Sequence, residues 1–526
     1  MKLNHTLTIV KTGSAVITIL VGTAIGAGTE VHGGELKTPQ AVEITVDTAR
    51  VVNTMRGGIG ASWHAIEKPI PIGHGGSGWG AYPPADDERA WQQIYKHAEW
   101  LGLDWNRVEI EQRVYEPEAG RFTFDTPEMR ILYRILDWNQ QHGADVFFQQ
   151  MWVNADWLAY PSARKDPVAR VHSAPQDLDA FADGLAALME HLIKKRGYTC
   201  IKWLSITNEP GAKWGWWNDA SGNPLPIGPG LDAVRKALAK RGVEVPLSGP
   251  DAGMEYFKTV LKPEEVLELG AYDFHDYGIR IDARSNGFME KQVRAVSGSV
   301  KFAHAQNKPV FLSEYGTLDW PITPEDTRPN APEAVLAGAE FVIRDANAGV
   351  DGFNRWSFLN RGNLDGKWQY VDTWDTGHDK LLPEFTPHMN SYFGLGLMSR
   401  FIAKHSQVLS VTVSDARVDK WQRVFCAAFR SGAGNVTIAV VNDAADPFAM
   451  RFAWAGMAPG GRFHRYQFGK AQFGRTDVTV KPDRDFAPAP GAGWTDTLPG
   501  NSLTIYSTYE LKMGDAGMIV DDKKDR

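Results

Sequence analysis

Cysteine is scarce in this sequence, which has only Cys200 and Cys426 among its 526 residues. Both lie in strand-like segments that we assign to different domains, so we expect two buried thiols and no disulfide. Clusters of Lys and Arg are also lacking, and the formal net charge of −7 argues against a nucleic-acid-binding surface. No Gly-x-Gly-x-x-Gly motif opens a helix and no His-Glu-x-x-His pair occurs, so neither a dinucleotide site nor a zinc protease site is indicated.

Long apolar runs are lacking except near the N-terminus. There, Lys2 and Lys11 supply positive charge, residues 15–25 are apolar, and Gly26-Ala27-Gly28 offers small residues for cleavage. This pattern predicts a signal peptide over residues 1–28 and export to the periplasm or the medium. The run is too short and too rich in glycine to favour a membrane-spanning helix, and an uncleaved anchor is the alternative. Residues 513–526 predict a charged, disordered tail.

Short apolar segments alternate with amphipathic segments eight times between residues 57 and 360. The amphipathic segments have helix ends: Asp86 begins the first, Gly102 stops it, and Thr126-Pro127 opens the second. This rhythm predicts an α/β fold, a (β/α)8 TIM barrel over residues 57–400, with an active site where strands run into the following loops. A doubly wound open sheet is the alternative. The expected strands are 58–63, 104–111, 144–151, 201–207, 244–249, 271–277, 309–314 and 351–358.

The rhythm changes after about residue 401, where strand-like segments follow one another without helices between them. Residues 401–512 therefore predict a C-terminal antiparallel β-sandwich. The segment 29–56 contains the alternating run Val42 to Val46, which we expect to add an edge strand to the sandwich. We expect the sandwich to brace the barrel.

Two carboxylates stand at the exits of expected barrel strands. Glu209 lies in Asn208-Glu209-Pro210 after the fourth strand, and Glu314 lies in Ser313-Glu314-Tyr315-Gly316 at the end of the seventh. Facing carboxylates are what hydrolysis of a glycosidic bond requires, since one protonates the leaving oxygen and the other stabilises or attacks the anomeric carbon. For either Glu alone, a helix cap or a surface salt bridge is the ordinary interpretation.

In these two motifs the chain resembles the retaining β-glycosidases of the (β/α)8-barrel clan that includes glycoside hydrolase families 5, 30 and 39. The resemblance covers residues 57–360, and the later sandwich is similar to the arrangement of families 30 and 39. It implies that Glu209 is the acid/base, that Glu314 is the nucleophile and that Asn208 binds the sugar 2-hydroxyl. It also implies a carbohydrate substrate. We expect no cofactor or metal, because the leaving group departs with a proton from a side chain.

The same resemblance extends to three further strands. His275 and Tyr277 share a face of the sixth strand, and the clan often places His and Tyr there, with the Tyr hydroxyl orienting the nucleophile. Arg107 on the second strand would hold the nucleophile ionised, although Glu109 and Glu111 on the same face would compete for its charge. Trp356, at the end of the eighth strand, corresponds to a Trp that floors the sugar subsite. A packed barrel layer is the alternative for each aromatic residue.

Nineteen Trp residues are many, and indole faces stack on sugar rings as readily as they fill cores. The loop that follows Glu209 carries three of them, which predicts a sugar platform over the acid. Strand exits predict further pocket residues. These candidates are Trp214, Trp216 and Trp217 in the loop, Trp63 and His64 at the first strand exit, and Trp152 and Asn154 at the third.

The sequence thus predicts an exported retaining β-glycoside hydrolase that cleaves β-linked oligo- or polysaccharides by double displacement. Transglycosylation on the same scaffold is one alternative, and a non-catalytic carbohydrate-binding barrel is the other. Which sugar and linkage are recognised, whether cleavage is exo or endo, and the oligomeric state are left open by the sequence.

Overall fold

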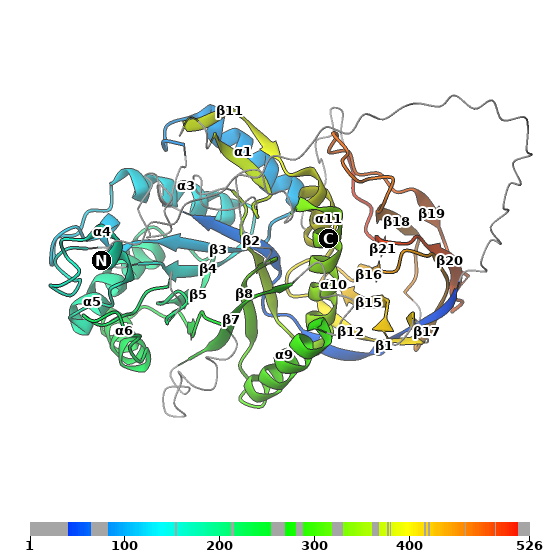
Figure 1. Ribbon diagram of the computed structural model, residues 1–526, viewed down its shortest axis with the longest axis horizontal. Helices are drawn as coiled ribbons and strands as arrows, with labels where there is room; N and C mark the ends of the chain where they lie inside the picture. Colours follow the sequence, from blue (N-terminus) through cyan, green and yellow to red (C-terminus); the bar gives the residue numbers. More distant parts are fainter. Residues whose placement is uncertain are drawn as a thin grey trace, which may run out of the picture. The chain divides into compact units, whose positions relative to one another are not determined.

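The structure is a computed structural model whose chain path is drawn in Figure 1. The N-terminal segment expected to be a signal peptide and the tail beyond Met513 lie outside the described residues. None of the helices in the described part of the chain has the length and apolarity needed to cross a membrane. The described residues are 40–64, 83–152, 155–211, 215–253, 269–279, 288–317, 330–359, 368–375, 378, 380–414, 417–418, 421–457, 459–489 and 491–513.

Eight parallel strands form a closed barrel in chain order, from β2 to β9. Closure is made by β2 and β9, where Ile59 pairs with Phe353 and Ala61 with Arg355. The predicted (β/α)8 barrel is therefore confirmed and the open doubly wound sheet is excluded. The barrel strands are β2 (Ile59–His64), β3 (Trp105–Ile110), β4 (Asp145–Gln150), β5 (Ile201–Ser205), β6 (Leu247–Gly249), β7 (Ala271–Ile279), β8 (Val310–Thr317) and β9 (Gly352–Arg355).

Three of the predicted helix signals lie at or beside helix ends, although α1 begins after Asp87 and not at Asp86. Asp87 caps α1 by accepting from the Ala90 amide, and Gly102 ends it in the left-handed region at φ 62°. Thr126 caps α3 by accepting from the Met129 amide. The helices are α1 (Glu88–Leu101), α2 (Gln112–Tyr115), α3 (Pro127–Gln141), α4 (Pro167–His172), α5 (Leu178–Met189) with the π-turns Glu190–Lys195, α6 (Gly228–Lys240), α9 (Phe288–His304), α10 (Pro332–Ala348) and α11 (Met389–Phe401).

Two elements between β9 and the sandwich were not predicted. A hairpin of β10 (Val371–Asp375) and β11 (Lys380–Pro387) follows the last barrel strand. Helix α11 then packs against α1 and α10, so it takes the eighth place in the helix ring. Its sequence is apolar nearly all round, because it also packs against the sandwich strands β18 and β21.

The second domain is a nine-stranded sheet. Strand β1 (Gln40–Thr54) joins it as expected, but the prediction of an edge strand is wrong, since β1 lies between β12 and β17 (Figure 1). Its pairing with β17 is parallel, which adds one parallel pair to an otherwise antiparallel sheet. The other strands of the sheet are β12 (Gln407–Ser414), β15 (Val424–Arg430), β16 (Val436–Asn442), β17 (Phe448–Ala455), β18 (Phe463–Phe468), β19 (Arg484–Phe486), β20 (Trp494–Leu498) and β21 (Ser502–Ser507). A separate small pair is β13 (Arg417–Val418) with β14 (Trp421–Gln422).

Aromatic residues close this sheet into a sandwich, and a hydrogen bond from α10 joins it to the barrel. Trp494, at one end of the strand order, lies 5.2 Å between ring centroids from Phe463 and from Phe486 at the other end. On the barrel side, the Asn347 amide on α10 donates to the Cys426 carbonyl at 2.8 Å. Cys426 and Cys200 are both buried and free, as the sequence predicted.

The barrel interior is layered, since alternate residues of each strand point inward. Its lowest layer is apolar, with Trp105 on β3, Phe147 on β4 and Phe311 on β8 in mutual ring contact. Two residues further along these strands, the interior becomes polar, with Arg107, Gln149 and Ser313. The apolar floor therefore carries a buried polar layer towards the carboxyl ends of the strands.

Candidate active site

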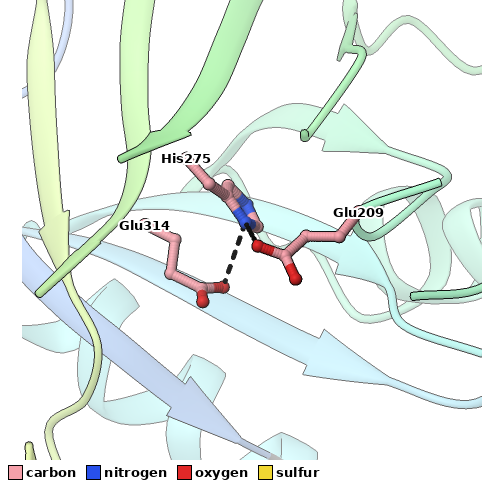
Figure 2. A group of neighbouring side chains, drawn as sticks. All are labelled: Glu209, His275 and Glu314. Atoms are coloured by element: carbon pink, nitrogen blue, oxygen red, sulfur yellow. Dashed lines mark hydrogen bonds and ion pairs between the residues drawn. The ribbon is translucent and has the colours of Figure 1, made fainter. Parts of the chain in front are cut away.

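The two candidate carboxylates meet at the carboxyl end of the barrel. Glu209 follows β5 and Glu314 lies in β8, and oxygen atoms of both lie within 4.8 Å of each other and of a His275 ring nitrogen. Figure 2 shows the His275 ring between the two carboxylates. The side chains of Glu209 and Glu314 are 13% and 7% exposed, so both are nearly covered yet reachable from solvent.

The backbone around Glu209 is held in an unusual conformation. Glu209 has φ 47° although it is not a glycine, which places it in the left-handed region that side chains rarely occupy. Its amide donates to the Asp251 carbonyl at 2.7 Å, and the Trp216 amide donates to the Asn208 carbonyl at 3.1 Å. Gly215 packs so closely that a Cβ there would lie 1.8 Å from the Glu209 carbonyl oxygen. The loop thus returns tightly over Glu209 and fixes its direction.

An irregularity in the β7–β8 pairing places Glu314. The register between these strands shifts between Phe274 and His275, so that His275 pairs with Glu314. Consecutive residues of a regular strand point to opposite faces, but here Ser313 and Glu314 both reach buried partners in the barrel interior. The shift therefore adds one inward side chain at the level of the site.

Arg107 is the central cation of the site and is fully buried. One guanidinium nitrogen donates to Glu314 Oε2 at 2.8 Å and to Glu109 Oε1 at 2.5 Å. The second terminal nitrogen of the guanidinium donates to Asn208 Oδ1 at 2.8 Å and to Asp251 Oδ2 at 3.1 Å. The expected contact between Arg107 and Glu314 is present, and the expected competition from Glu109 is present too.

His275 and Tyr277 both reach Glu314, each in a different way. The Tyr277 hydroxyl donates to Glu314 Oε1. His275 Nδ1 lies 2.9 Å from Glu209 Oε1 and 3.7 Å from Glu314 Oε2, while its Nε2 lies 2.9 Å from Asp251 Oδ1. Tyr277 is therefore the aromatic residue that hydrogen-bonds Glu314, and His275 bridges the carboxylates.

Three site residues were not predicted from the sequence. Asp251, after β6, has φ 54° and is fully buried beneath the two carboxylates. Gln149 on β4 donates to Asp251 Oδ2 and to the Thr207 carbonyl, and the Ser313 hydroxyl donates to Asp251 Oδ1 at 3.0 Å. The rule that selected Glu209, an acid directly after a barrel strand, also fits Asp251.

Burial and neighbouring charges shift the pKa values of the site. Burial raises the pKa of Glu314 to about 7, against the opposing effects of His275 and Arg107, and the charge of Glu209 adds to the rise. Burial opposes protonation of His275, but the carboxylates of Glu314 and Asp251 hold its pKa well above the usual range. Burial and the charge of Asp251 raise the pKa of Asp273 to about 8. Near neutral pH the site therefore holds a protonated His275 and a neutral Asp273.

The spacing of Glu209, His275 and Glu314 would admit a cation, and they are the one such group that the described residues contain. Both oxygens of Glu314, however, already accept from protein donors, one from Tyr277 and one from the Arg107 cation. A metal at this point would have to displace these donors and stand beside Arg107. The arrangement therefore fits a pair of reacting carboxylates better than a metal centre.

Trp356 and His64 lie beside the site, almost entirely covered. The Arg107 guanidinium carbon lies 5.9 Å from the Trp356 ring centroid, and the His64 ring lies 5.1 Å from it. His64 Nδ1 pairs with Glu109 Oε2 at 2.8 Å. Trp368, from the segment before β10, was not predicted and approaches Tyr277 at 5.8 Å between ring centroids. These rings form the wall around Arg107 and Tyr277.

The prediction that four other tryptophans line the pocket is wrong. Trp216 and Trp217 are buried and pack against each other and against Phe181 of α5. Trp63 packs against Trp138 of α3, and Trp152 is fully buried in the same core. All four belong to the large apolar core that also contains residues of the surrounding helices. Asn154 and Trp214 lie outside the described residues, and Glu111 pairs with Arg113.

No family model and no curated protein matches the chain, whereas many solved structures match its fold. The family 30 subfamily 8 xylanase Xyn30A from Clostridium acetobutylicum matches with TM-score 0.60 and 15% identity, over 88% of this chain and 99% of that one. The α-L-arabinofuranosidase from Thermotoga maritima matches with TM-score 0.59 and 13% identity, over 89% and 99%. The family 39 enzyme from Xanthomonas axonopodis pv. citri matches with TM-score 0.55 and 12% identity, over 89% and 97%.

These matches define the class of fold. The chain has the (β/α)8 barrel with a β-sandwich that is found in glycoside hydrolases of families 30 and 39. The resemblance predicted from the motifs around Glu209 and Glu314 is thus confirmed for the fold over nearly the whole length of both chains.

Proposed function

We propose that this protein is a retaining β-glycoside hydrolase. The observation that carries the proposal is the close approach of Glu209 and Glu314, whose oxygen atoms lie within 4.8 Å across one site. Carboxyl groups about 5–5.5 Å apart support retention, whereas inversion needs about 6.5–9.5 Å to seat a water between them. The fold, shared with glycoside hydrolases of families 30 and 39, supports the same conclusion.

Glu314 is the nucleophile in this proposal. It attacks the anomeric carbon while the bond to the leaving oxygen breaks and Glu209 transfers its proton to that oxygen. Arg107 and Tyr277 donate to different oxygens of Glu314, which orients the carboxylate for attack and stabilises its ionised form. In the second step, Glu209 removes a proton from water, and the water oxygen displaces Glu314 from the sugar.

Asn208 is placed to bind the sugar beside the reacting carbon. Its Oδ1 accepts from Arg107 at 2.8 Å and from Gln149 at 3.4 Å. With the oxygen occupied, the amide NH2 is the group that can donate to a sugar hydroxyl. Such a contact, strengthened in the transition state, raises kcat more than it lowers KM.

We propose β-linked oligo- or polysaccharides as the substrate class, with β-xylosides as the first compounds to test. A xylanase is among the similar structures, and only the fold connects it with this chain. Export belongs to the same proposal and depends on residues 1–28. N-terminal sequencing of the protein recovered from the periplasm or medium tests it, and recovery only from the cytoplasm would contradict it.

A panel of aryl β-glycosides tests the hydrolase proposal, with the first-formed sugar anomer identified by proton NMR. A retaining hydrolase releases phenol and forms the β-anomer first, before mutarotation. Release of the α-anomer would contradict the retaining mechanism, and longer products would indicate transglycosylation. Binding of oligosaccharides without release of phenol would indicate a non-catalytic barrel.

A further inference from the structure

The carboxylate of Asp251 lies under the reacting pair and has a distinct set of partners on each oxygen. Oδ1 lies 2.9 Å from His275 Nε2 and accepts from the Ser313 hydroxyl at 3.0 Å. Oδ2 accepts from Arg107 at 3.1 Å and from the Gln149 amide. The side chain is fully buried, so its four donors all come from the protein.

Two of the four partners of Asp251, Arg107 and His275, also contact the two proposed catalytic acids. Arg107 reaches Glu314 Oε2 at 2.8 Å, and His275 reaches Glu209 Oε1 at 2.9 Å. Each oxygen of Asp251 is therefore one contact away from one catalytic acid. We infer that Asp251 is a positioning residue, which holds Arg107 against Glu314 and a doubly protonated His275 against Glu209. This inference deepens the proposed function and rests on it.

The backbone supports this role independently of the side chain. Asp251 has φ 54° and Glu209 has φ 47°, and the Glu209 amide donates to the Asp251 carbonyl at 2.7 Å. Residues with side chains adopt the left-handed region at a cost in conformational energy, so two of them persist here only because the surroundings hold them. The same residue thus fixes the backbone of Glu209 through its carbonyl and the His275 ring through its carboxylate.

Several charged side chains from different barrel strands surround the His275 ring. They are the carboxyls of Glu209 after β5, Asp251 after β6, Asp273 on β7 and Glu314 on β8, and the cation Arg107 on β3. Asp251 is the one that faces Nε2. Because the Asp251 carboxylate can only accept a hydrogen bond, His275 Nε2 carries a proton. The charges of Glu314 and Asp251 hold the pKa of His275 high, so Nδ1 carries a proton as well.

A different interpretation is that Asp251 only neutralises the buried Arg107. In that case, replacing Asp251 would weaken folding but would leave the protonation of His275 unchanged. The two interpretations therefore differ at the imidazole, which NMR can observe without any substrate.

The test compares the wild type with Asp251→Asn, labelled with 15N-histidine, with the His275 signals assigned from the His275→Asn spectrum. In the wild type at pH 7 we expect both ring nitrogens of His275 to carry protons. In Asp251→Asn we expect His275 to lose one proton at lower pH than in the wild type. A neutral His275 in the wild type, or an unchanged titration in the variant, would overturn the inference. The wild-type measurement decides the matter even if the variant does not fold.

Kinetics on an active aryl glycoside provide the second readout. We expect Asp251→Asn to lower kcat about 10- to 100-fold, the range typical of groups that orient a reacting residue, with KM changed less than about threefold. The matched control is Asp345→Asn on α10, a fully buried acid outside the site whose pKa burial raises well above its usual value. An amide has nearly the size and shape of this carboxyl, so activity should stay within about twofold of wild type.

The outcomes separate this inference from the proposed function. If the wild type cleaves glycosides and Glu314→Gly does not, while Asp251→Asn keeps its kcat and its His275 titration, the function stands and the role of Asp251 is wrong. If the wild type cleaves no glycoside, the hydrolase proposal fails, and the imidazole titration alone decides whether Asp251 holds His275.

Discussion

Arg107→Gln is the substitution that most directly tests the electrostatics of the site. The guanidinium is fully buried and donates to four acceptors, three of them the carboxylates of Glu109, Asp251 and Glu314. Removing one partner of a buried ion pair costs about 3–5 kcal/mol, because the other charge is left uncompensated. We expect a loss of about 3 kcal/mol at neutral pH, the lower end of that range, since Glu314 can take up a proton there.

The loss should depend on pH in a definite direction. Arg107 acts to lower the pKa of Glu314, so its removal raises that pKa further above about 7. Protonated acids no longer need the cation, and the variant should be less destabilised at pH 5 than at pH 8. The kinetic profile should move in the same direction: kcat/KM of the wild type rises with pH through about 7, and that rise shifts to higher pH in Arg107→Gln.

Urea unfolding at several pH values and pH profiles of kcat/KM measure both effects. The control is Arg121→Gln, whose ion pair with Glu118 has side chains 64% and 67% exposed. Exposed pairs of this kind contribute less than about 1 kcal/mol, so the control should unfold almost like wild type. Equal stability losses in the two variants, or an Arg107→Gln pH profile superimposable on that of wild type, would refute the electrostatic account.

Four other substitutions have definite expected results. Glu314→Gly should abolish turnover, and added azide should restore it by attacking from the same face; near-normal activity would remove Glu314 from the nucleophile role. Glu209→Ala should slow substrates with poor leaving groups about 100-fold more than activated aryl substrates, and equal losses would contradict its acid role. The hydrogen bond from Tyr277 lowers the pKa of Glu314, so its loss in Tyr277→Phe should raise that pKa and move the rise of kcat/KM to higher pH; an unmoved profile would argue against the contact. Trp216→Ala should destabilise folding by about 3–5 kcal/mol with KM unchanged, whereas a raised KM in a stable variant would restore it as a substrate contact.

The barrel was predictable because its signals are local. Each strand–helix unit shows its own periodicity and its own caps, such as Thr126 before α3 and Gly102 after α1. Parallel closure then brings the ends of distant strands together, so Glu209 and Glu314 could be placed in one site without any knowledge of their contacts. The position of β1 was not predictable in this way, because its partners β12 and β17 lie more than 350 residues further along the chain.

Asp251 and the loop tryptophans show where sequence reasoning failed. Strand β6 is only three residues long, too short for alternation to show which face Asp251 takes, and its φ of 54° departs from strand geometry altogether. Trp216 and Trp217 stand near a catalytic motif, but the backbone of Gly215 turns the loop back against Glu209. The tryptophans then reach Phe181 of α5. Position in a loop therefore did not indicate exposure.

The site holds more acids than cations, which bears on how it would act. The carboxyls that meet within it are Glu109, Glu209, Asp251, Asp273 and Glu314. Asp273 is neutral near pH 7. Even when Glu209 holds the proton that it donates, the carboxylates of Glu109, Asp251 and Glu314 outnumber the two cations, Arg107 and a protonated His275. Negative charge is costly in a buried place, and burial, together with the charge of Glu209, raises the pKa of Glu314 to about 7. A glycosyl transition state brings positive charge on the anomeric carbon to this point, and the excess is then neutralised. The excess of negative charge within the site would therefore make it complementary to that transition state, because the reaction creates positive charge at this point.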